Sequence, residues 1–262
     1  NFVAAAVSKE VGLAGPSIHS MFLANHKLYS RMAERNPIRF SGFRLNSDLW
    51  RQSLTFPVHI KPMSLFFSLL QRTVYSEEEL EIAVQELRSS LPKWERPFCE
   101  LFRHYVNEEQ YPLANEYSFL VEEFVDDVVS QHAVEGWTDA NRNHYIWAVS
   151  DNNYWPGIGS SLDSNTVPTC LSPEMADKVS KVALDTVERF DMSNGFWNVE
   201  IWIRSNGRVQ VTEVNGRICA SMTPLYRSVY GKSQYLPVLK LSCGQPVDLI
   251  TDTPQEPIGV GG

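Results

Sequence analysis

The sequence feature that most constrains the fold is a β-hairpin signal in the last third of the chain. The dipeptide Asn206-Gly207 separates two runs rich in β-branched and aromatic residues, Trp197–Ile203 and Val209–Val214. Asn-Gly between two such runs is a strong short-range signal for a hairpin. We therefore expect the two runs to pair as antiparallel strands.

Two glutamates and one asparagine accompany the predicted hairpin. Glu200 lies in the first strand, Glu213 lies in the second, and Asn215 stands at its end. Pairing would bring two carboxylates and a carboxamide together, and these oxygen ligands suit Mg²⁺, or alternatively Mn²⁺, when phosphates and water complete the coordination. In a second interpretation Glu200 faces solvent on an edge strand and Glu213 begins a turn. Spacing alone favours this second interpretation, because most Glu side chains are exposed.

The remaining pattern predicts an α+β protein, because strands and helices alternate without a regular βαβ period. We expect further strands at residues 56–62, 117–125, 131–137 and 145–149. The expected helices are an opening helix with Val3, Ala6, Val7 and Val11 at helical spacing, a second from about Ser17 with Met21, Leu28 and Met32 on one face, a third over residues 77–87 capped by Ser76 and Glu79, and a fourth that starts at Pro173 after the cap Ser172.

Charge and composition exclude several classes of protein. The formal net charge of -8 argues against binding to nucleic acid or to a polyanionic membrane surface. No apolar run reaches the roughly 18 residues that a membrane span requires. The four cysteines are widely separated and lack zinc-type spacing, so we interpret them as buried reduced thiols of a cytoplasmic protein.

Two cations stand where a phosphate could bind. Lys61 follows an apolar strand and precedes a proline, and Arg217 closes the run Glu213-Val214-Asn215-Gly216-Arg217. Either residue, taken alone, is more often a solvated surface side chain. P-loop, dinucleotide-binding and nucleophile-elbow motifs are all absent from the sequence, so a nucleotide would have to bind in another way.

The order of these elements over most of the chain resembles the ATP-grasp superfamily, and in particular its carboxylate-amine ligases of the D-alanine:D-alanine ligase and biotin carboxylase type. The segments that carry the resemblance are Ala5–Ser17 followed by Lys27 and Arg31, Phe56–Pro62, Leu120–Val125, Gln131–Gly136, Gly195–Glu200 and Glu213–Arg217. The last two segments are the most specific, because they resemble the hairpin that carries the metal ligands in these enzymes.

The resemblance implies a role for each matching residue. It implies Lys27 and Lys61 on the phosphates of ATP, a hinge of Glu122, Glu123, Phe124 and Val125 at the adenine, Gln131 at the ribose position, Glu200, Glu213 and Asn215 on Mg²⁺, and Arg217 at the γ-phosphate or acyl phosphate. Asn198 occupies a position where some relatives place an oxyanion-binding arginine. The family usually has a glycine-rich phosphate lid after the strand lysine, whereas residues 63–70 are apolar here.

The implied fold has two α+β subdomains that clasp the nucleotide. We expect linker helices over residues 1–50, a first ATP-grasp subdomain over 51–130 and a second over 131–262. The family's preceding α/β domain would be largely missing before Asn1, which opens in mid-pattern.

The implied activity is an ATP-dependent ligase. A small-molecule carboxylate would be activated as an acyl phosphate and joined to an amine, and a homodimer is a family-level expectation. Two alternatives remain open: a biotin-carboxylase-like activity with bicarbonate as the carboxylate, and a catalytically degenerate nucleotide-binding module with a regulatory role. The apolar segment and Gln131 favour the degenerate module, whereas retention of Glu200, Glu213, Asn215 and Arg217 favours the ligase.

Overall fold

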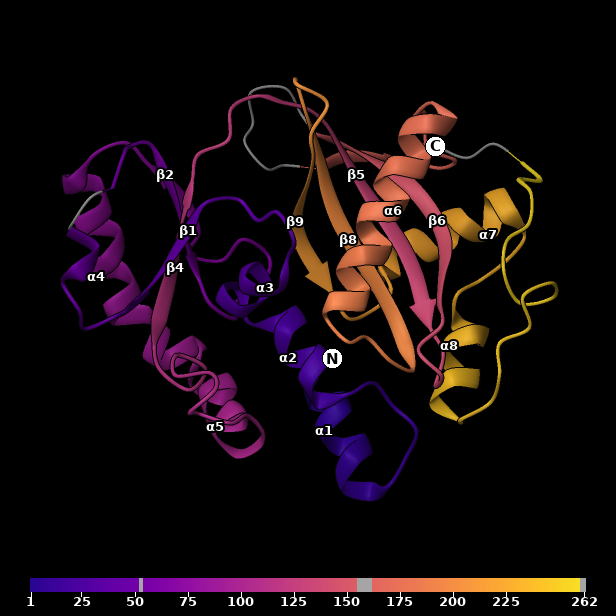
Figure 1. Ribbon diagram of the computed structural model, residues 1–262, viewed down its shortest axis with the longest axis horizontal. Helices are drawn as coiled ribbons and strands as arrows, with labels where there is room; N and C mark the ends of the chain where they lie inside the picture. The colour runs from indigo at the N-terminus through magenta and orange to yellow at the C-terminus, as the bar shows by residue number, and fades with distance from the viewer. Residues whose placement is uncertain (52–53, 155–161, 260–262) are drawn as a thin grey trace. The chain divides into compact units, whose positions relative to one another are not determined.

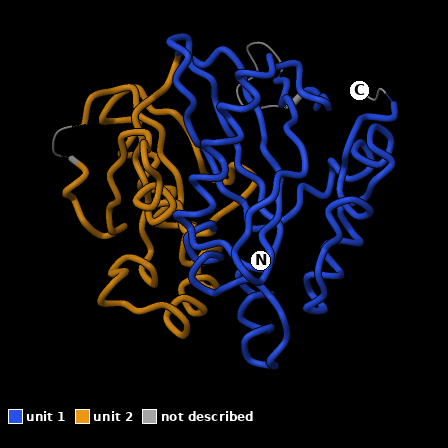
Figure 2. The backbone as a smooth tube through the Cα atoms, turned by 45° about the vertical axis from the view of Figure 1, so that its right-hand side comes forward, with its two compact units in different colours: residues 1–24, 127–262 blue, residues 25–126 orange. Residues whose placement is uncertain are grey.

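The computed structural model describes residues 1–51, 54–154 and 162–259, and the chain divides into two compact units. Unit 2 comprises residues 25–126, and unit 1 comprises residues 1–24 with residues 127–262 (Figure 2). In the described part of the chain, each unit contains one antiparallel sheet (Figure 1). The three parts expected from the sequence divide the chain by role and stay a prediction.

The sheet of unit 2 has a central strand that carries a glutamate beside the predicted phosphate lysine. Its order is β1-β4-β2-β3, with β1 Phe40–Arg44, β2 Val58–Pro62, β3 Arg72–Val74 and β4 Ser118–Glu123. The register sets His59 opposite Glu122 and Lys61 opposite Leu120. Because directly opposed residues share a face, the side chains of His59, Lys61 and Glu122 all belong to one face of the sheet.

Helix α4 (Glu77–Trp94) covers the opposite, apolar face. Its Leu80, Val84 and Leu87 are buried in one cluster with Ile60 and Val121. The predicted cap is present at its start, where the hydroxyl of Ser76 accepts the backbone N–H of Glu79. Helix α5 (Arg96–Tyr105) follows directly, and a short 3-10 helix η1 (Leu49–Arg51) precedes β2.

Helix α3 (Lys27–Ala33) packs on the face that carries Lys61. Leu28 of α3 lies so close to Gly42 of β1 that an added Cβ would stand 2.9 Å from its methyl carbons. Gly42 is opposite Leu120, which shares its face with Lys61. The missing side chain at Gly42 therefore lets α3 approach the sheet closely.

The sheet of unit 1 contains the predicted hairpin. Its order is β7-β6-β5-β8-β9, with β5 Val128–Thr138, β6 His144–Tyr154, β7 Leu162–Thr166, β8 Gly195–Arg204 and β9 Val209–Asn215. Helix α6 (Pro173–Arg189) lies along one face of this sheet (Figure 1). Its Val179, Ala183 and Val187 are fully buried there, and Ser172 caps its start by accepting the N–H of Met175.

The other face of this sheet changes from apolar to polar along the strands. Trp137 and Phe196 are opposite each other and belong to an apolar cluster with α7 (Thr223–Tyr230) and α8 (Tyr235–Ser242). Two residues before Trp137, on the same face of β5, stands the buried Glu135. A 3-10 helix η2 (Ala220–Met222) leads into α7.

The opening helix is present, but its predicted face is mostly wrong. Helix α1 (Phe2–Val11) buries Phe2, Ala5 and Ala6, whereas Val3, Val7 and Val11 are each more than half exposed. Ala and Val occur all round this helix, so periodicity could not select the face that packs. The helix ends as expected at Gly12, which adopts the left-handed conformation.

The helix expected from Ser17 onward is two helices. Helix α2 (Ile18–Asn25) and α3 are separated at His26, whose backbone is extended (φ -101°, ψ 101°). Met21 and Leu28 are buried as expected, but Met32 is 63% exposed. The break changes the phase of the helical pattern, and a single continuous helix is therefore wrong as a prediction.

The cysteines also differ from expectation. All four are free, and Cys99 is buried, but Cys170 and Cys243 are exposed. None of the helices in the described residues is long and apolar enough to cross a membrane.

A test of the close packing in unit 1 uses Gly136, which lies at a bulge between β5 and β6. A Cβ at Gly136 would stand 2.3 Å from the Trp197 ring and from the carbonyl oxygen of Tyr145. We expect Gly136→Ala to lower the free energy of unfolding by about 1–3 kcal/mol, because the core has no room for the methyl group. Urea denaturation measures the change.

The matched control is Gly195→Ala in β8, where the nearest atom to a new Cβ is 3.4 Å away. A loss in Gly136→Ala no larger than the loss in Gly195→Ala would contradict the close packing at Gly136.

Candidate active site

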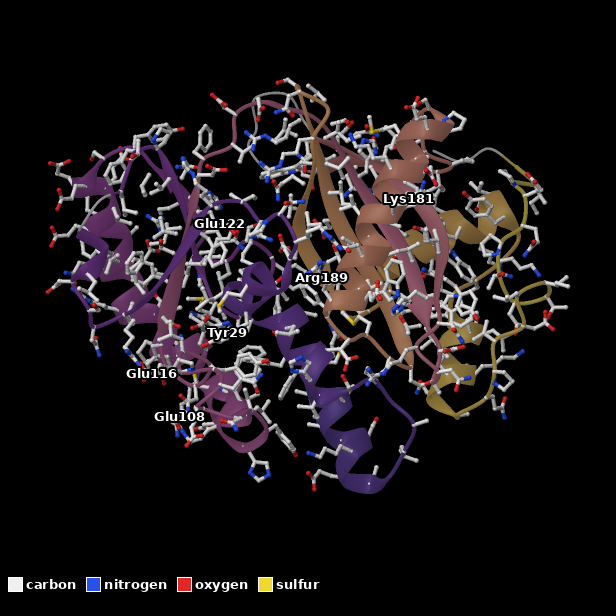
Figure 3. All side chains as sticks on the ribbon, viewed as in Figure 1. Tyr29, Glu108, Glu116, Glu122, Lys181 and Arg189 are labelled. Carbon is white, nitrogen blue, oxygen red and sulfur yellow. The ribbon has the colours of Figure 1, made fainter. Side chains whose placement is uncertain are left out.

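The strand lysine of unit 2 is held by a buried carboxylate. Lys61 Nζ lies 2.7 Å from Glu122 Oε2, and the Lys61 side chain is only 14% exposed. Glu122, labelled in Figure 3, lies on β4, two positions along the same sheet face from Leu120, the register partner of Lys61. The ammonium group is therefore fixed before any ligand arrives.

Glu122 carries a second ion pair on its other oxygen. Its Oε1 accepts the Nε–H of Arg31 at 2.6 Å, and Arg31 in turn donates from Nη1 to Glu34 at 2.6 Å. Although burial by itself would raise the pKa of Glu122, the charges of Arg31 and Lys61 lower it to about 2. Burial raises the pKa of Glu34 despite its pairing with Arg31. These side chains thus form a row of ion pairs, Glu34–Arg31–Glu122–Lys61. Lys61 ends the row at the surface of the sheet.

His59 adds no charge to this surface near neutral pH. Burial, and then the charge of the neighbouring Lys61, lower the pKa of His59 to about 4. Its Nδ1 is 3.2 Å from the hydroxyl of Thr73. Lys61 is therefore the cation that this face of β2 presents to an anion.

Lys27 and Glu95 hold the segment that follows Lys61. The backbone N–H of Lys27 donates to Met63 O at 2.8 Å, and its ammonium donates to Leu65 O at 2.5 Å. The carboxylate of Glu95 accepts the backbone N–H of Ser64 at 2.8 Å. Glu95 is buried, and burial raises its pKa to about 7.

The apolar segment predicted in place of a glycine-rich lid has two parts. Residues 63–65 are buried, whereas Phe66 is half exposed and Phe67 is 97% exposed. Phe67, Ser68 and Leu70 have positive φ values of 57°, 53° and 60°, a conformation that side chains other than Gly disfavour. The exposed part begins directly after the residues that Lys27 and Glu95 anchor.

The hinge residues lie at and beyond the end of β4. Glu123 pairs with Arg39, with Nε and Oε2 2.7 Å apart. Phe124 is 40% exposed, and Val125 is half-buried. Both oxygens of the Glu122 carboxylate are paired with cationic side chains, one with Arg31 and the other with Lys61.

The metal candidates of unit 1 meet on one face of the β8–β9 hairpin. The register sets Glu200 opposite Glu213 and Asn198 opposite Asn215. Asn215 Nδ2 donates to Glu200 Oε1 at 3.3 Å. The structure therefore excludes the solvent-facing edge for Glu200, because β8 lies between β5 and β9.

Arg217 belongs to the same group of side chains. Its Nη2 donates to Asn215 Oδ1 at 3.2 Å, although the side chain is largely exposed. Gly216 lies against Met21 of α2, and a Cβ there would stand 2.4 Å from the Met21 sulfur. This contact brings the loop after β9 close against α2.

The structure also shows the surroundings of Asn198, Gln131 and Tyr154. Asn198 is buried, and the side-chain oxygen of the ribose candidate Gln131 accepts the indole N–H of Trp202 at 2.9 Å. Burial, and then the charges of Glu200 and Glu213, raise the pKa of Tyr154. Tyr154 at the end of β6 therefore lies near the acidic pair.

The donor set suits a hard cation. Among the described residues, no three His, Cys, Asp or Glu side chains cluster as metal ligands. The two carboxylates and one carboxamide oxygen of the hairpin match the ligands that Mg²⁺ takes from a protein when phosphates and water supply the rest. The residues present therefore fit the expected ion.

Two buried carboxylates next to the candidate site residues, Glu95 and Glu135, were not predicted from the sequence. Glu95 lies between two helices, where an acidic residue is common and gives no signal. Glu135 interrupts an apolar strand run, and an acidic residue inside such a run is a signal of a buried polar contact that could have been followed.

Two antiparallel α+β units of this kind define the ATP-grasp fold class. The sequence profile of the ATP-grasp domain matches residues 54–224, which is more than half of the chain, and the chain belongs to this family. The family and fold expected from the sequence are thereby confirmed.

Solved structures share the fold at low sequence identity. The L-amino acid ligase from Bacillus licheniformis has a TM-score of 0.76 and 17% identity over 98% of this chain and 59% of its own. The biotin carboxylase–β,γ-ATP complex from Campylobacter jejuni has a TM-score of 0.72 and 14% identity over 97% of this chain and 54% of its own. N5-carboxyaminoimidazole ribonucleotide synthetase from Thermotoga maritima has a TM-score of 0.64 and 13% identity over 95% of this chain and 57% of its own.

This chain therefore spans little more than half of each of these proteins. A search of curated protein sequences gives no match.

The buried carboxyl of Glu95 predicts a pH-dependent stability. Because its folded pKa is raised to about 7 from 4.5, the folded state binds a proton more tightly than the unfolded state. This contribution is fully present below pH 4.5, decreases as the pH rises from there, and is lost once the pH has passed about 7. When the pH is lowered from 8 to 5.5, Glu95 should raise the free energy of unfolding of the wild type by about 1–2 kcal/mol. We expect Glu95→Gln to lack this gain.

Urea unfolding at the two pH values measures this difference. The control Glu100→Gln changes an exposed carboxylate nearby and should leave the pH dependence unaltered. An identical pH dependence in the wild type and in Glu95→Gln would contradict the raised pKa.

Proposed function

We propose that the whole protein is an ATP- and Mg²⁺-dependent ligase that joins a small-molecule carboxylate to an amine. The observation that carries the proposal is the shared face of Glu200, Glu213 and Asn215, with Arg217 reaching Asn215 from the following loop. Membership of the ATP-grasp family supports ATP binding. Structural similarity to an L-amino acid ligase supports a carboxylate-amine ligase within that family.

In this proposal unit 2 binds the nucleotide. Lys61 and Lys27 would donate to phosphate oxygens, and the backbone of Phe124 and Val125 would meet the adenine. The ion pair with Glu122 keeps Lys61 ordered, so less side-chain entropy is lost when a phosphate binds. Lys27 would exchange its bond to Leu65 O for a phosphate oxygen.

Unit 1 supplies the groups for phosphoryl transfer. Glu200, Glu213 and Asn215 would hold Mg²⁺, which neutralises negative charge on the phosphates when it is bound. Arg217 would donate to the transferring phosphoryl group, and Asn198 offers an amide on the same sheet face. Gln131 would contact the ribose.

The reaction that suits these groups has two steps. A carboxylate oxygen attacks the γ-phosphorus, the bond to the β-phosphate oxygen breaks, and ADP leaves with its electron pair. The amine nitrogen then attacks the acyl carbon, phosphate leaves, and the nitrogen loses a proton to give the amide. Positioning and charge neutralisation supply most of the rate increase in such transfers.

Loops near the hairpin would select the substrates. Cys219–Met222 begins two residues after Arg217, and a second loop, Tyr154–Gly159, is described only at Tyr154 because residues 155–159 lie outside the described residues. Bicarbonate in place of an organic carboxylate would make the activity biotin-carboxylase-like, and comparing ADP release with either acid separates the two. Cytoplasmic location and dimerisation stay predictions.

The first test of nucleotide binding uses Lys61→Met, which removes the ammonium group and keeps most of the buried side chain. We expect Mg²⁺-dependent ATP affinity to fall roughly 10- to 100-fold, the loss of one charge-assisted hydrogen bond. Isothermal titration calorimetry with and without Mg²⁺ measures it. Lys181→Met on the exposed side of α6 is the control. An unchanged affinity would remove Lys61 from the site, and no ATP binding by the wild type would favour the degenerate module.

A second test concerns the metal ligands. Glu213→Ala should abolish Mg²⁺-dependent ADP release while the melting temperature stays close to that of the wild type, because Glu213 is only half-buried. A coupled ADP assay with pairs of carboxylates and amines gives the rate, and Glu188→Ala on α6 is the control. Wild-type turnover in Glu213→Ala would show that the hairpin does not hold the ion.

A further inference from the structure

Glu135 is a buried carboxylate next to the candidate catalytic loop. It lies on β5 and is fully buried. Its Oε1 accepts the backbone N–H of Cys219 at 2.6 Å. Cys219 stands two residues after Arg217, so this bond ties the central strand of the sheet to the loop over residues 216–222 that carries the arginine.

The other oxygen of Glu135 continues the contact into two helices. Gln234 Nε2 donates to Glu135 Oε2 at 3.4 Å, and Thr223 Oγ1 donates to Gln234 Oε1 at 3.1 Å. All three side chains are buried. Thr223 begins α7 and Gln234 is the N-cap position of α8, so the network fixes both ends of the segment that follows the loop.

A buried carboxylate is costly, and packing alone does not require one here. The neighbouring positions of β5 are apolar, and an apolar residue at 135 would bury without a desolvation penalty. Burial raises the pKa of Glu135, while its hydrogen bonds and the charge of Arg217 lower it. What the carboxylate supplies instead is a strong acceptor at a defined point for a loop N–H.

Register places this anchor directly beside the candidate site. Glu135 is opposite Asn198, and Asn198 is opposite Asn215, so the three side chains form one row across β5, β8 and β9 on one face. Because Glu135 is fully buried, it does not touch a substrate itself. Its hydrogen bond to the Cys219 amide links it to the loop that carries Arg217.

We propose that Glu135 is a positioning residue, which fixes the loop over residues 216–222 and thereby holds Arg217 at the site of phosphoryl transfer. This inference rests on the proposed function. A structural parallel outside the site is Asp151, whose Oδ2 accepts the backbone N–H of Cys170 at 2.7 Å before α6. Asp151 therefore offers a matched control, a buried carboxylate that holds a loop without a candidate site residue.

The kinetic test compares Glu135→Gln with Asp151→Asn in the full chain. We expect Glu135→Gln to lower kcat for ADP release roughly 10- to 100-fold and to leave the KM for ATP within about threefold, because a displaced Arg217 affects transfer more than binding. Asp151→Asn should keep kcat within about twofold. Equal kcat losses in the two variants, or a Glu135→Gln effect confined to KM, would overturn the proposal.

A double-mutant cycle shows whether the effect passes through Arg217. In an Arg217→Lys background, Glu135→Gln should cost less than about twofold further in kcat, because the group to be positioned is already lost. Full additivity of the two substitutions would overturn the inference. Glu135→Asp keeps the charge but shortens the reach to Cys219, and it should therefore fail to restore kcat.

A readout without catalysis separates this inference from the proposed function. Hydrogen exchange at the Cys219 amide should become roughly tenfold faster in Glu135→Gln, while the Cys170 amide should respond only to Asp151→Asn. If the wild type released no ADP, the proposed function would fail while this exchange result still tested the anchor. Unchanged exchange over residues 216–222 in Glu135→Gln would overturn the anchor itself.

Discussion

The antiparallel register of β5, β8 and β9 is the constraint on which the candidate site depends. Directly opposed residues in such a sheet share a face, and successive residues alternate between faces. One register therefore puts Val134, Val199 and Val214 in a buried row, and puts Glu135, Asn198 and Asn215 in the row of the opposite face. A slip of one strand by one residue would turn its valine toward the donor set and its polar residue toward α6, so the packing of α6 and the alignment of the donor set depend on the same register.

Unit 2 solves a different problem, which is to keep a cation ordered in a largely buried place. A single buried ion pair often costs as much in desolvation as it gains. Here Glu122 is shared between Arg31 and Lys61, and Arg31 is shared with Glu34, so each inner charge has two partners. The outermost member of the chain is the lysine, and its ammonium group is the one left able to meet an anion.

Local signals in the sequence predicted the parts of the fold that depend on near neighbours. The Asn206-Gly207 turn and the Ser76 and Ser172 caps are determined within a few residues, and all are confirmed. The buried face of α1 was predicted wrongly, and the break at His26 was not predicted. Both depend on tertiary contacts instead of near neighbours in the sequence. The assigned roles of the site residues stay predictions, although the register brings the three metal candidates together as the hairpin required.

The two units share one structural feature that was not predicted from the sequence. In unit 2 the buried Glu95 accepts a backbone N–H three residues after Lys61, and in unit 1 the buried Glu135 accepts one two residues after Arg217. Both carboxylates come from elements far from the loops they hold, and burial raises the pKa of each. A hydrogen bond from the loop backbone to a carboxylate on a rigid element holds the loop in place. This bond does not use the side chain of the neighbouring lysine or arginine, so the N–H groups of that side chain stay available to a ligand. In this arrangement a buried glutamate holds each loop, and a different side chain, Lys61 or Arg217, would bind the ligand.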